Sequence, residues 1–501
     1  MERPDTLLYR AAQVRELDRL TIETFGIPGY TLMCRAGEAL LAVVREHFPR
    51  AHRLVVLCGP GNNGGDGYVV ARLAREAGFH VRLFRLADPE RIRGDAARAR
   101  QAWLAAGGGE TPWEGRLPER SDLLVDALLG TGLERPVEGA FLDAIRAMDA
   151  HPAPVVAADI PSGLHADSGA VLGAAARAAV TVTFIGLKQG LFTGAGPDRC
   201  GEIRYHRLGA PAEIHRRLPA SARLMEDTLR DPLRRPRPRD AHKGRFGHLL
   251  VVGGAPGMSG AARLAGEAAL RSGAGLVSVA THPRHAAHLN AGRPELMVHG
   301  VAESEELRPL LERAGAVAIG PGLGREGWGR ALLEACLATD LPLVVDADAL
   351  NLLAEDVPRS RGHWVVTPHP GEAARLLGMT VPQVQADRFH AVRALAEATG
   401  AVAVLKGAGT LVHDDSGTLV CHRGNPGMAS GGTGDLLTGI VGALLAQGME
   451  AGEAARLGVW LHALAGDRAA GRRGERGLLA SDLLDELPLL VNPPQGATHG
   501  H

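Results

Sequence analysis

The sequence has little of what would support a disulfide-stabilised or membrane-spanning protein. Its five cysteines are an odd number, lie far apart and form no CxxC pair, which argues against a disulfide framework and a structural zinc site. No apolar run approaches the length needed to cross a bilayer, and the first residues lack the continuous apolar segment of a signal peptide. We therefore expect a cytoplasmic protein.

The sequence also lacks an excess of charge of one sign, because 55 lysines and arginines balance 56 aspartates and glutamates. A nearly neutral chain has no overall positive field to attract nucleic acid or an anionic membrane. The P-loop motif GxxxxGK[ST] and the zinc motif HExxH are missing as well. We expect small-molecule substrates, no nucleic-acid or membrane partner, and a homo-oligomer whose subunit number no residue specifies.

Both halves of the chain alternate short apolar runs with helix-like stretches. The runs include LVVLC at 54–58 and DLLVDALLG at 122–130 in the first half, and HLLVVGG at 248–254 and PLVVDAD at 342–348 in the second. This alternation is typical of a mostly parallel sheet with helices on both faces. Because 501 residues exceed what one core usually holds, we predict an α/β protein with two three-layer α/β/α domains.

The boundary between the domains is predicted from a change in composition. At 217–240 prolines and arginines replace the apolar periodicity, which favours a solvated linker over a basic nucleic-acid-binding patch. The first domain is predicted at 1–216 and the second at 226–492, so that the second overlaps the end of the linker. The tail 493–501 has no core pattern and is predicted to be disordered.

A glycine-rich loop, GPGNNGGDG at 59–67, follows the first apolar run. Three of its glycines have the GxGxxG spacing of dinucleotide-binding dehydrogenases, and Asp88 lies near the end of the next strand. Asp66 argues against that interpretation, because its carboxylate would lie close to the pyrophosphate and repel it. A purely structural alternative stays open, in which the glycines supply positive φ angles and Asp66 caps a helix that begins near Tyr68.

Polar residues follow three apolar runs of the first half. Asn63, Asp126, Asp159 and Ser162 all lie at predicted strand ends. Carboxyl ends of parallel strands share one edge of a sheet, where ligands bind, so these side chains could line one pocket. For each residue alone, capping of a turn is an alternative.

The segments NNGGDGYVVAR, VDALLGTGLERP and DIPSGL occur in this order, and together they resemble the NAD(P)H-hydrate epimerase domain over about residues 9–215. The resemblance implies a Rossmann-like domain in which Asp159 is catalytic and Asn63, Asp126 and Ser162 hold a potassium ion. It also implies contacts with the hydrated dinucleotide from Asn62, Asn63, Gly64, Gly65, Asp66, Gly130, Thr131, Gly132, Leu133, Glu134, Arg135, Pro136 and Asp159. The residue types fit, since inversion at a hydroxylated ring carbon needs proton transfer, which a carboxylate can assist.

The second half contains another glycine-rich loop, NPGMASGGTGD at 425–435. Asp435 follows its glycines at a predicted helix start, where it could accept a proton from a substrate hydroxyl while backbone N–H groups hold a phosphoryl group. An ordinary acidic residue in a first helical turn is the alternative.

This half resembles the ADP- or ATP-dependent NAD(P)H-hydrate dehydratase, a ribokinase-like fold, over about 226–492. The resemblance implies that Asp435 is catalytic. It implies nucleotide contacts from Lys406, Gly407, Ala408, Gly409, Thr410 and Gly434, and contacts with the hydrated cofactor from Ala261, Gly322, His369 and Asp435. Asp346 and Glu372 are weaker candidates for a Mg²⁺ environment. Structural alternatives are a Lys406 that only extends beside a strand, and an Asp348 that caps a helix.

Together the two resemblances imply a bifunctional NAD(P)H-hydrate repair enzyme that interconverts the R and S hydrates and dehydrates the S form at the expense of ADP, giving AMP and phosphate. No residue decides between ADP and ATP. The competing hypothesis is a ribokinase-like kinase for a vitamin or sugar, with a first domain that binds a dinucleotide without turnover.

Overall fold

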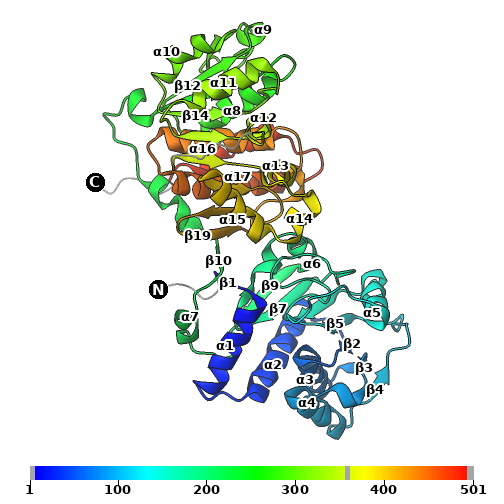
Figure 1. Cartoon of the computed structure of the whole chain (residues 1–501). Coiled ribbons are helices and arrows are strands. Elements are labelled where there is room, and N and C mark those ends of the chain that lie inside the picture. Colours follow the sequence, from blue (N-terminus) through cyan, green and yellow to red (C-terminus); the bar gives the residue numbers. More distant parts are fainter. Residues whose placement is uncertain (1–5, 356–361, 494–501) are drawn as a thin grey trace. The chain divides into compact units, whose positions relative to one another are not determined.

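Figure 1 shows the computed structural model, which describes residues 6–355 and 362–493. The chain divides into two units, residues 1–223 and 224–501. Among the described residues no helix is long and apolar enough to cross a membrane. Residues 494–501 of the predicted tail lie outside the described part of the chain.

The first unit is built on a seven-stranded sheet in which every pair of neighbours is parallel. Its spatial order is β4 (Glu110–Pro112), β3 (His80–Arg85), β2 (Arg53–Cys58), β5 (Leu123–Ala127), β6 (Val155–Ala158), β7 (Val180–Phe184) and β9 (Glu202–His206). Three short strands lie outside it, with β1 (Leu7–Tyr9) parallel to β8 (Leu187–Lys188) and antiparallel to β10 (Ala222–Leu224).

Helices cover both faces of this sheet, as the alternation of buried side chains along β2 requires. Val56 and Cys58 belong to a core formed with α1 to α4, whereas Val55 and Leu57 pack with α5. The helices are α1 (Ala11–Glu23), α2 (Gly29–His47), α3 (Asn62–Glu76), α4 (Gly94–Ala105), α5 (Gly139–Ala150), α6 (Gly196–Arg199) and α7 (Glu213–Arg217), with 3₁₀ turns at Pro89–Arg91 and Gln189–Phe192. The predicted three-layer arrangement is confirmed.

The second unit has a larger sheet, in the order β13 (Met297–Gly300), β12 (Leu276–Thr281), β11 (His248–Val252), β14 (Ala316–Ile319), β15 (Leu343–Val345), β16 (Trp364–Val366), β17 (Val402–Leu405), β18 (Thr410–Asp414) and β19 (Gly417–Cys421). Its strands are parallel to one another from β13 to β17. The last two strands, β18 and β19, each pair antiparallel with the strand before them. The parallel part confirms the prediction for this half. The closing hairpin was not predicted.

One face of this sheet packs against α8, α16 and α17, whose side chains share a core with Val251, Ala318 and Val344. The intervening residues Val252 and Ile319 are also buried, so the sheet is covered on both faces. The longer helices are α8 (Ser259–Arg271), α11 (Gly327–Leu337), α12 (Ala347–Leu353), α13 (Pro370–Leu377), α14 (Val381–Ala386), α15 (Arg388–Thr399), α16 (Thr433–Ala446) and α17 (Ala451–Arg473). The shorter ones are α9 (Pro283–Ala286), α10 (Arg308–Leu311), α18 (Ala480–Leu484) and α19 (Leu487–Leu490), with 3₁₀ turns η3 (Asp227–Arg234), η4 (Lys243–Phe246), η5 (Ser304–Leu307) and η6 (Pro426–Met428).

The predicted linker differs from a solvated connector, because much of it packs on the second unit. Met225 is fully buried in the core of that unit, and its N–H donates to the carbonyl of Val420 over 2.9 Å. Asp227 accepts a hydrogen bond from the Trp460 indole over 3.3 Å, and Arg230 donates to the carbonyl of Leu490 over 3.0 Å. The second unit therefore begins earlier than the apolar pattern of the sequence indicates.

A fragment that begins at Pro236 should consequently be less stable than one that begins at Leu224. We expect a difference in the free energy of unfolding of about 2–5 kcal/mol, the usual cost of emptying a buried methionine site. Urea unfolding of the two fragments measures it, with Met225→Ala in the longer fragment as the matched variant. Equal midpoints for all three proteins would show that the segment contributes no stability.

Candidate functional site

The first glycine-rich loop brings backbone segments together. A Cβ on Gly64 would lie 2.0 Å from the carbonyl oxygen of Gly59, and one on Gly59 would lie 1.8 Å from that of Leu128. Helix α3 begins at Asn62, and the loop glycines do not have positive φ angles. The structural alternative, with glycines at positive φ and a helix that begins near Tyr68, is therefore wrong. These glycines instead permit close approach of backbone segments.

Asn63, Asp126 and Ser162 come together at the carboxyl ends of β2, β5 and β6. The Ser162 hydroxyl donates to Asp126 Oδ1 over 2.6 Å, and the Ser162 N–H donates to Oδ2 over 2.7 Å. Asn63 Nδ2 donates to the carbonyl of Leu129 over 3.0 Å, whereas its Oδ1 is buried without a hydrogen-bond partner. Burial raises the pKa of Asp126 to about 6 against the opposing effect of the Ser162 hydrogen bonds. The cluster therefore contains several potential oxygen ligands, and one of them, the buried Asn63 Oδ1, has no hydrogen-bond partner.

Asp159 follows β6 in a left-handed conformation, with φ of 65°. Its Oδ1 accepts hydrogen bonds from the Phe184 N–H over 3.2 Å and from the ammonium of Lys188, which is fully buried. Lys188 also donates to the Thr183 hydroxyl and the Phe184 carbonyl, each over 3.0 Å. A buried cation thus fixes the orientation of the predicted catalytic carboxylate.

Two further carboxyls interact electrostatically with this ion pair. Burial raises the pKa of Asp66 well above its ordinary value, and Asp159 and Asp18 raise it further. Burial also raises the pKa of Asp18, in α1, to about 7, with Lys188 opposing the effect. Two carboxyl groups with raised pKa values therefore lie near the ion pair of Asp159 and Lys188, and carboxyl groups of this kind suit proton transfer.

The predicted contact loop 130–136 lies only partly within this cluster. A Cβ on Gly130 would lie 3.4 Å from Cβ of Asn63, so the loop starts beside the glycine-rich turn. Most of the loop beyond it is exposed, and a Glu134 carboxylate oxygen lies 3.3 Å from His165 Nε2. The loop therefore offers an exposed edge to a ligand.

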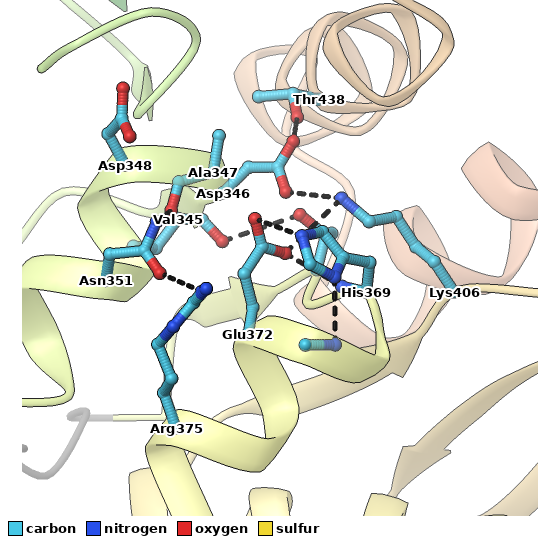
Figure 2. Close-up of polar contacts among 12 residues, drawn as sticks. Val345, Asp346, Ala347, Asp348, Asn351, His369, Glu372, Arg375, Lys406 and Thr438 are labelled. Atoms are coloured by element: carbon cyan, nitrogen blue, oxygen red, sulfur yellow. Dashed lines mark hydrogen bonds and ion pairs between the residues drawn. The ribbon is translucent and has the colours of Figure 1, made fainter. Parts of the chain in front are cut away.

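In the second unit, the buried Asp346 and the partly exposed Lys406 form an ion pair at 2.7 Å (Figure 2). Asp346 follows β15 and Lys406 follows β17, and the second oxygen of Asp346 accepts a 2.7 Å hydrogen bond from Thr438 of α16. Although burial lowers the pKa of Lys406, Asp346 and Glu372 raise it more, so that the net change is upward. Lys406 is thus an ion-paired residue and does more than extend beside a strand.

His369 and Glu372 begin α13 and face the same ion pair (Figure 2). Glu372 accepts a 2.8 Å hydrogen bond from the His369 N–H and lies 3.9 Å from the Lys406 ammonium. Burial raises the pKa of Glu372 to about 7, and burial lowers the pKa of His369. Asp346 and Glu372 therefore place two carboxyl groups around one cation, an arrangement whose oxygens also suit Mg²⁺.

Asp435 lies in the first turn of α16, whose N-cap Gly432 provides no side chain. A Cβ on the intervening Gly434 would lie 3.4 Å from Lys406 Nζ, so the helix start directly adjoins the ion pair. Burial raises the pKa of Asp435 to about 7, Asp346 adds to the rise, and Lys406 opposes it. The site therefore combines a carboxyl group whose pKa lies near 7, a lysine and a helix N-terminus.

The remaining predicted contacts lie nearby in two groups. Residues 406–410 connect β17 to β18, and the Thr410 hydroxyl donates to the Gly407 carbonyl over 3.0 Å. Ala261 and Gly322 lie against each other, since a Cβ on Gly322 would be 3.3 Å from that of Ala261. Asp348 does not cap α12, because its side chain accepts a 3.0 Å hydrogen bond from the Gly324 N–H and the N-cap residue is Asp346.

Sequence reasoning missed several residues of these sites, including Asp18, Lys188 and Thr438. The signal for Lys188 was a single charged residue in the apolar stretch VTVTFIGLKQG, because an isolated lysine there must find a partner when buried. Thr438 and Asp18 gave no comparable signal, since each lies on a helix among ordinary neighbours.

Family models match both units. Residues 249–489 match the model described as NAD(P)H-hydrate dehydratase, and residues 29–190 match that of the YjeF-related protein N-terminus.

Full-length relatives and a solved structure agree with these matches. The chain is 49% identical to the bifunctional NAD(P)H-hydrate repair enzyme of Coxiella burnetii over 97% of this chain and 100% of that protein. It is 46% identical to the enzyme of that name from Escherichia coli, over 98% and 95% of the two chains. A ribokinase-like superfamily protein from Enterococcus faecalis is similar in structure, with a TM-score of 0.51 and 31% identity over 55% of this chain and 98% of that one. The ribokinase-like prediction for the second unit is confirmed.

The raised pKa of Glu372 predicts a pH-dependent stability difference. From its ordinary value of 4.5 up to about 7, the folded chain holds a proton that the unfolded chain releases, so rising pH destabilises the parent through this window. Glu372→Gln stays neutral. Relative to the parent, its free energy of unfolding should therefore rise by up to about 3 kcal/mol between pH 4.5 and 8, which is the equivalent of that pKa change. Urea unfolding of the full chain across this range measures the difference. Parallel curves for the two proteins would contradict the assignment.

Proposed function

The chain belongs to the family of bifunctional NAD(P)H-hydrate repair enzymes, and we propose that its two sites act in turn on the same damaged cofactor. The enzyme is an NAD(P)H-hydrate epimerase and dehydratase. The first unit interconverts the R and S hydrates, and the second dehydrates the S form. Removal of the S form draws the R form through the epimerase.

Asp435 is the proposed base of the dehydratase. It accepts the proton of the ring hydroxyl while the hydroxyl oxygen bonds to the terminal phosphorus of ADP, and the bond from that phosphorus to AMP breaks. Phosphate then leaves the ring together with a proton from the neighbouring carbon, which restores the dihydropyridine. The observation that carries this proposal is the place of Asp435 in the first turn of α16, where a Cβ on the preceding Gly434 would lie 3.4 Å from Lys406 Nζ. Burial raises the pKa of Asp435 to about 7, and a base works best when its pKa lies near the working pH.

Residues 406–410 and Gly434 would hold the nucleotide. Lys406 lies within reach of a phosphate at the start of α16, where the helix dipole also favours negative charge. Ala261, Gly322 and His369 would contact the hydrated cofactor. Asp346 and Glu372 would hold Mg²⁺, which screens phosphate charge when it is bound.

Asp159 is the proposed catalytic residue of the epimerase. Its ion pair with Lys188 engages Oδ1, and its side chain is 17% exposed, so that the other oxygen would be available to a ligand. Inversion at the hydroxylated ring carbon needs a proton to be removed and returned as the ring opens and closes, and Asp159 would carry that proton. Residues 62–66 and 130–136 would line the dinucleotide.

Asn63, Asp126 and Ser162 would hold a potassium ion. The support is the buried Asn63 Oδ1, which has no hydrogen-bond partner. Asn63 Nδ2 and the Ser162 hydroxyl both donate to the Leu129 carbonyl, and that hydroxyl also donates to Asp126, so the three side chains lie close together. A hard monovalent cation prefers oxygen ligands of this kind. When bound, it would neutralise part of the charge of Asp126.

ADP is the donor we propose, since the full-length bacterial relatives are bifunctional enzymes of the kind in which ADP is expected. A homo-oligomeric assembly and a cytoplasmic location stay predictions.

Asp435→Asn should abolish most of the dehydration. With S hydrate and ADP, the parent should restore the absorbance of reduced nicotinamide, and the variant should do so about two to four orders of magnitude more slowly. The R-to-S exchange of the same chain is the internal control and should keep its rate. A stable phosphorylated product in place of phosphate and reduced dinucleotide would instead support the small-molecule kinase.

The pH profile tests the same assignment. Below pH 7 Asp435 is mostly protonated and cannot accept a proton, so the kcat of the parent should rise with pH through an apparent pKa of about 7. The Glu372→Gln variant should keep this rise, because Asp435 is intact. A profile that is flat from pH 5 to 8 would mean that the base lies elsewhere.

Asp159→Asn should affect only the R hydrate. It keeps the size of the side chain and removes the basic carboxylate, so the R hydrate should be repaired only as fast as it epimerises unaided. The S hydrate should be dehydrated at the parent rate. Asp143→Asn, an exposed position of α5, is the matched control and should change neither rate. Equal loss on both hydrates would indicate a folding defect.

A further inference from the structure

A buried arginine lies beneath the loop 406–410. Arg388 is the first residue of α15 and is 1% exposed. Its Nη2 donates to the carbonyl oxygens of Leu405 and Lys406, each over 3.2 Å, and to that of Gly409 over 3.5 Å. Its Nη1 donates to the Gln385 side chain over 2.9 Å. One guanidinium therefore joins the beginning and the end of the loop.

The loop sequence is adapted to this arginine. Gly407 has a φ of 135°, and a Cβ there would lie 3.1 Å and 3.2 Å from the two terminal nitrogens of Arg388. An L-residue at this position would therefore be strained and would also crowd the guanidinium. Gly407 is thus explained by the arginine as well as by its own backbone conformation.

The carbonyl contacts determine where the N–H groups of the loop point. In a trans peptide the C=O and the following N–H point in opposite directions. Because the carbonyl of Lys406 turns toward Arg388, the N–H group of Gly407 turns away from it. An N–H group presented by a glycine-rich loop can donate to an anionic oxygen. Burial lowers the pKa of Arg388 only to about 10, so the guanidinium stays charged at neutral pH.

We propose that Arg388 is a positioning residue of the nucleotide subsite, which holds the loop 406–410 in the conformation that receives the phosphates of a nucleoside diphosphate. This inference rests on the proposed function, in which that loop binds the nucleotide. Arg388 itself lies behind the loop and acts through the backbone.

Arg388→Met should weaken nucleotide binding without changing the chemistry. If the competent loop conformation becomes a minor one, the KM for ADP rises by the inverse of its population, and we expect about 10- to 100-fold. The kcat and the KM for the S hydrate should stay within about twofold of the parent. Arg388→Lys should rescue only part of the affinity, because an ammonium cannot reproduce the planar set of donors.

Three variants separate the possible outcomes. Arg393→Met, on the same helix, is the matched control and should leave the KM for ADP unchanged. Gly407→Ala should raise that KM as Arg388→Met does, and it serves as the test if Arg388→Met does not fold. Lys406→Met tests the underlying nucleotide site itself.

An unchanged KM for ADP in both Arg388→Met and Gly407→Ala, with a raised KM in Lys406→Met, would overturn the positioning role and keep the proposed function. An unchanged KM for ADP in Arg388→Met, Gly407→Ala and Lys406→Met would overturn the proposed nucleotide site. A fall in kcat with an unchanged KM for ADP would also overturn the inference, since it would show a structural or catalytic effect.

Discussion

The ion pair between the buried Asp346 and Lys406 is the interaction on which the second site depends. It connects the ends of β15 and β17, and Thr438 attaches the same carboxylate to α16. Removing one partner from such a pair leaves a buried charge uncompensated, which typically costs about 3–5 kcal/mol. The backbone accommodates the pair at a further cost, because Ala347 has a φ of 48° and a Cβ on Gly320 would lie 1.8 Å from the Asp346 carbonyl oxygen.

The first unit also uses a buried lysine, but for a different purpose. An ammonium has three donors, and Lys188 directs them at Asp159, Thr183 and the Phe184 carbonyl. Within the described part of the chain, the Lys406 ammonium makes one hydrogen bond, to Asp346. Lys188 is therefore fully committed to orienting a carboxylate, whereas Lys406 retains donors for an incoming phosphate.

The fold and the loops that carry the chemistry could be predicted because both follow from local patterns. Buried parallel strands appear as apolar runs, and the glycine-rich turns at 59–67 and 425–435 mark strand-to-helix connections. The packed segment that begins at Met225 could not be identified as easily. Met225, Leu229 and Leu233 recur every four residues, a helical spacing, but prolines and arginines around them conceal the pattern.

The partners of the site residues were unpredictable for a different reason. Asp159 and Lys188, or Asp346 and Lys406, are brought together by strand order, which a single sequence does not specify. Arg388 is a further case, because nothing at the start of a helix indicates that its side chain will lie beneath a loop formed after the next strand. Such contacts depend on the tertiary structure.

The burial that raises the pKa of Asp435, the base we propose, also makes this carboxyl group destabilising to the fold. Its pKa rises to about 7 mainly through burial, and Asp346 adds to the rise although that residue is itself paired with Lys406. A carboxyl group whose pKa is raised by folding destabilises the folded state at neutral pH, because the protein must either retain the proton or bury the charge. The raised pKa also makes the ionised carboxylate a stronger base, which is what the proposed removal of a proton from a ring hydroxyl requires. The Asp346–Lys406 ion pair and the Asp435 carboxyl group are therefore complementary parts of one site. The ion pair fixes the geometry that Asp435 needs for the proposed reaction.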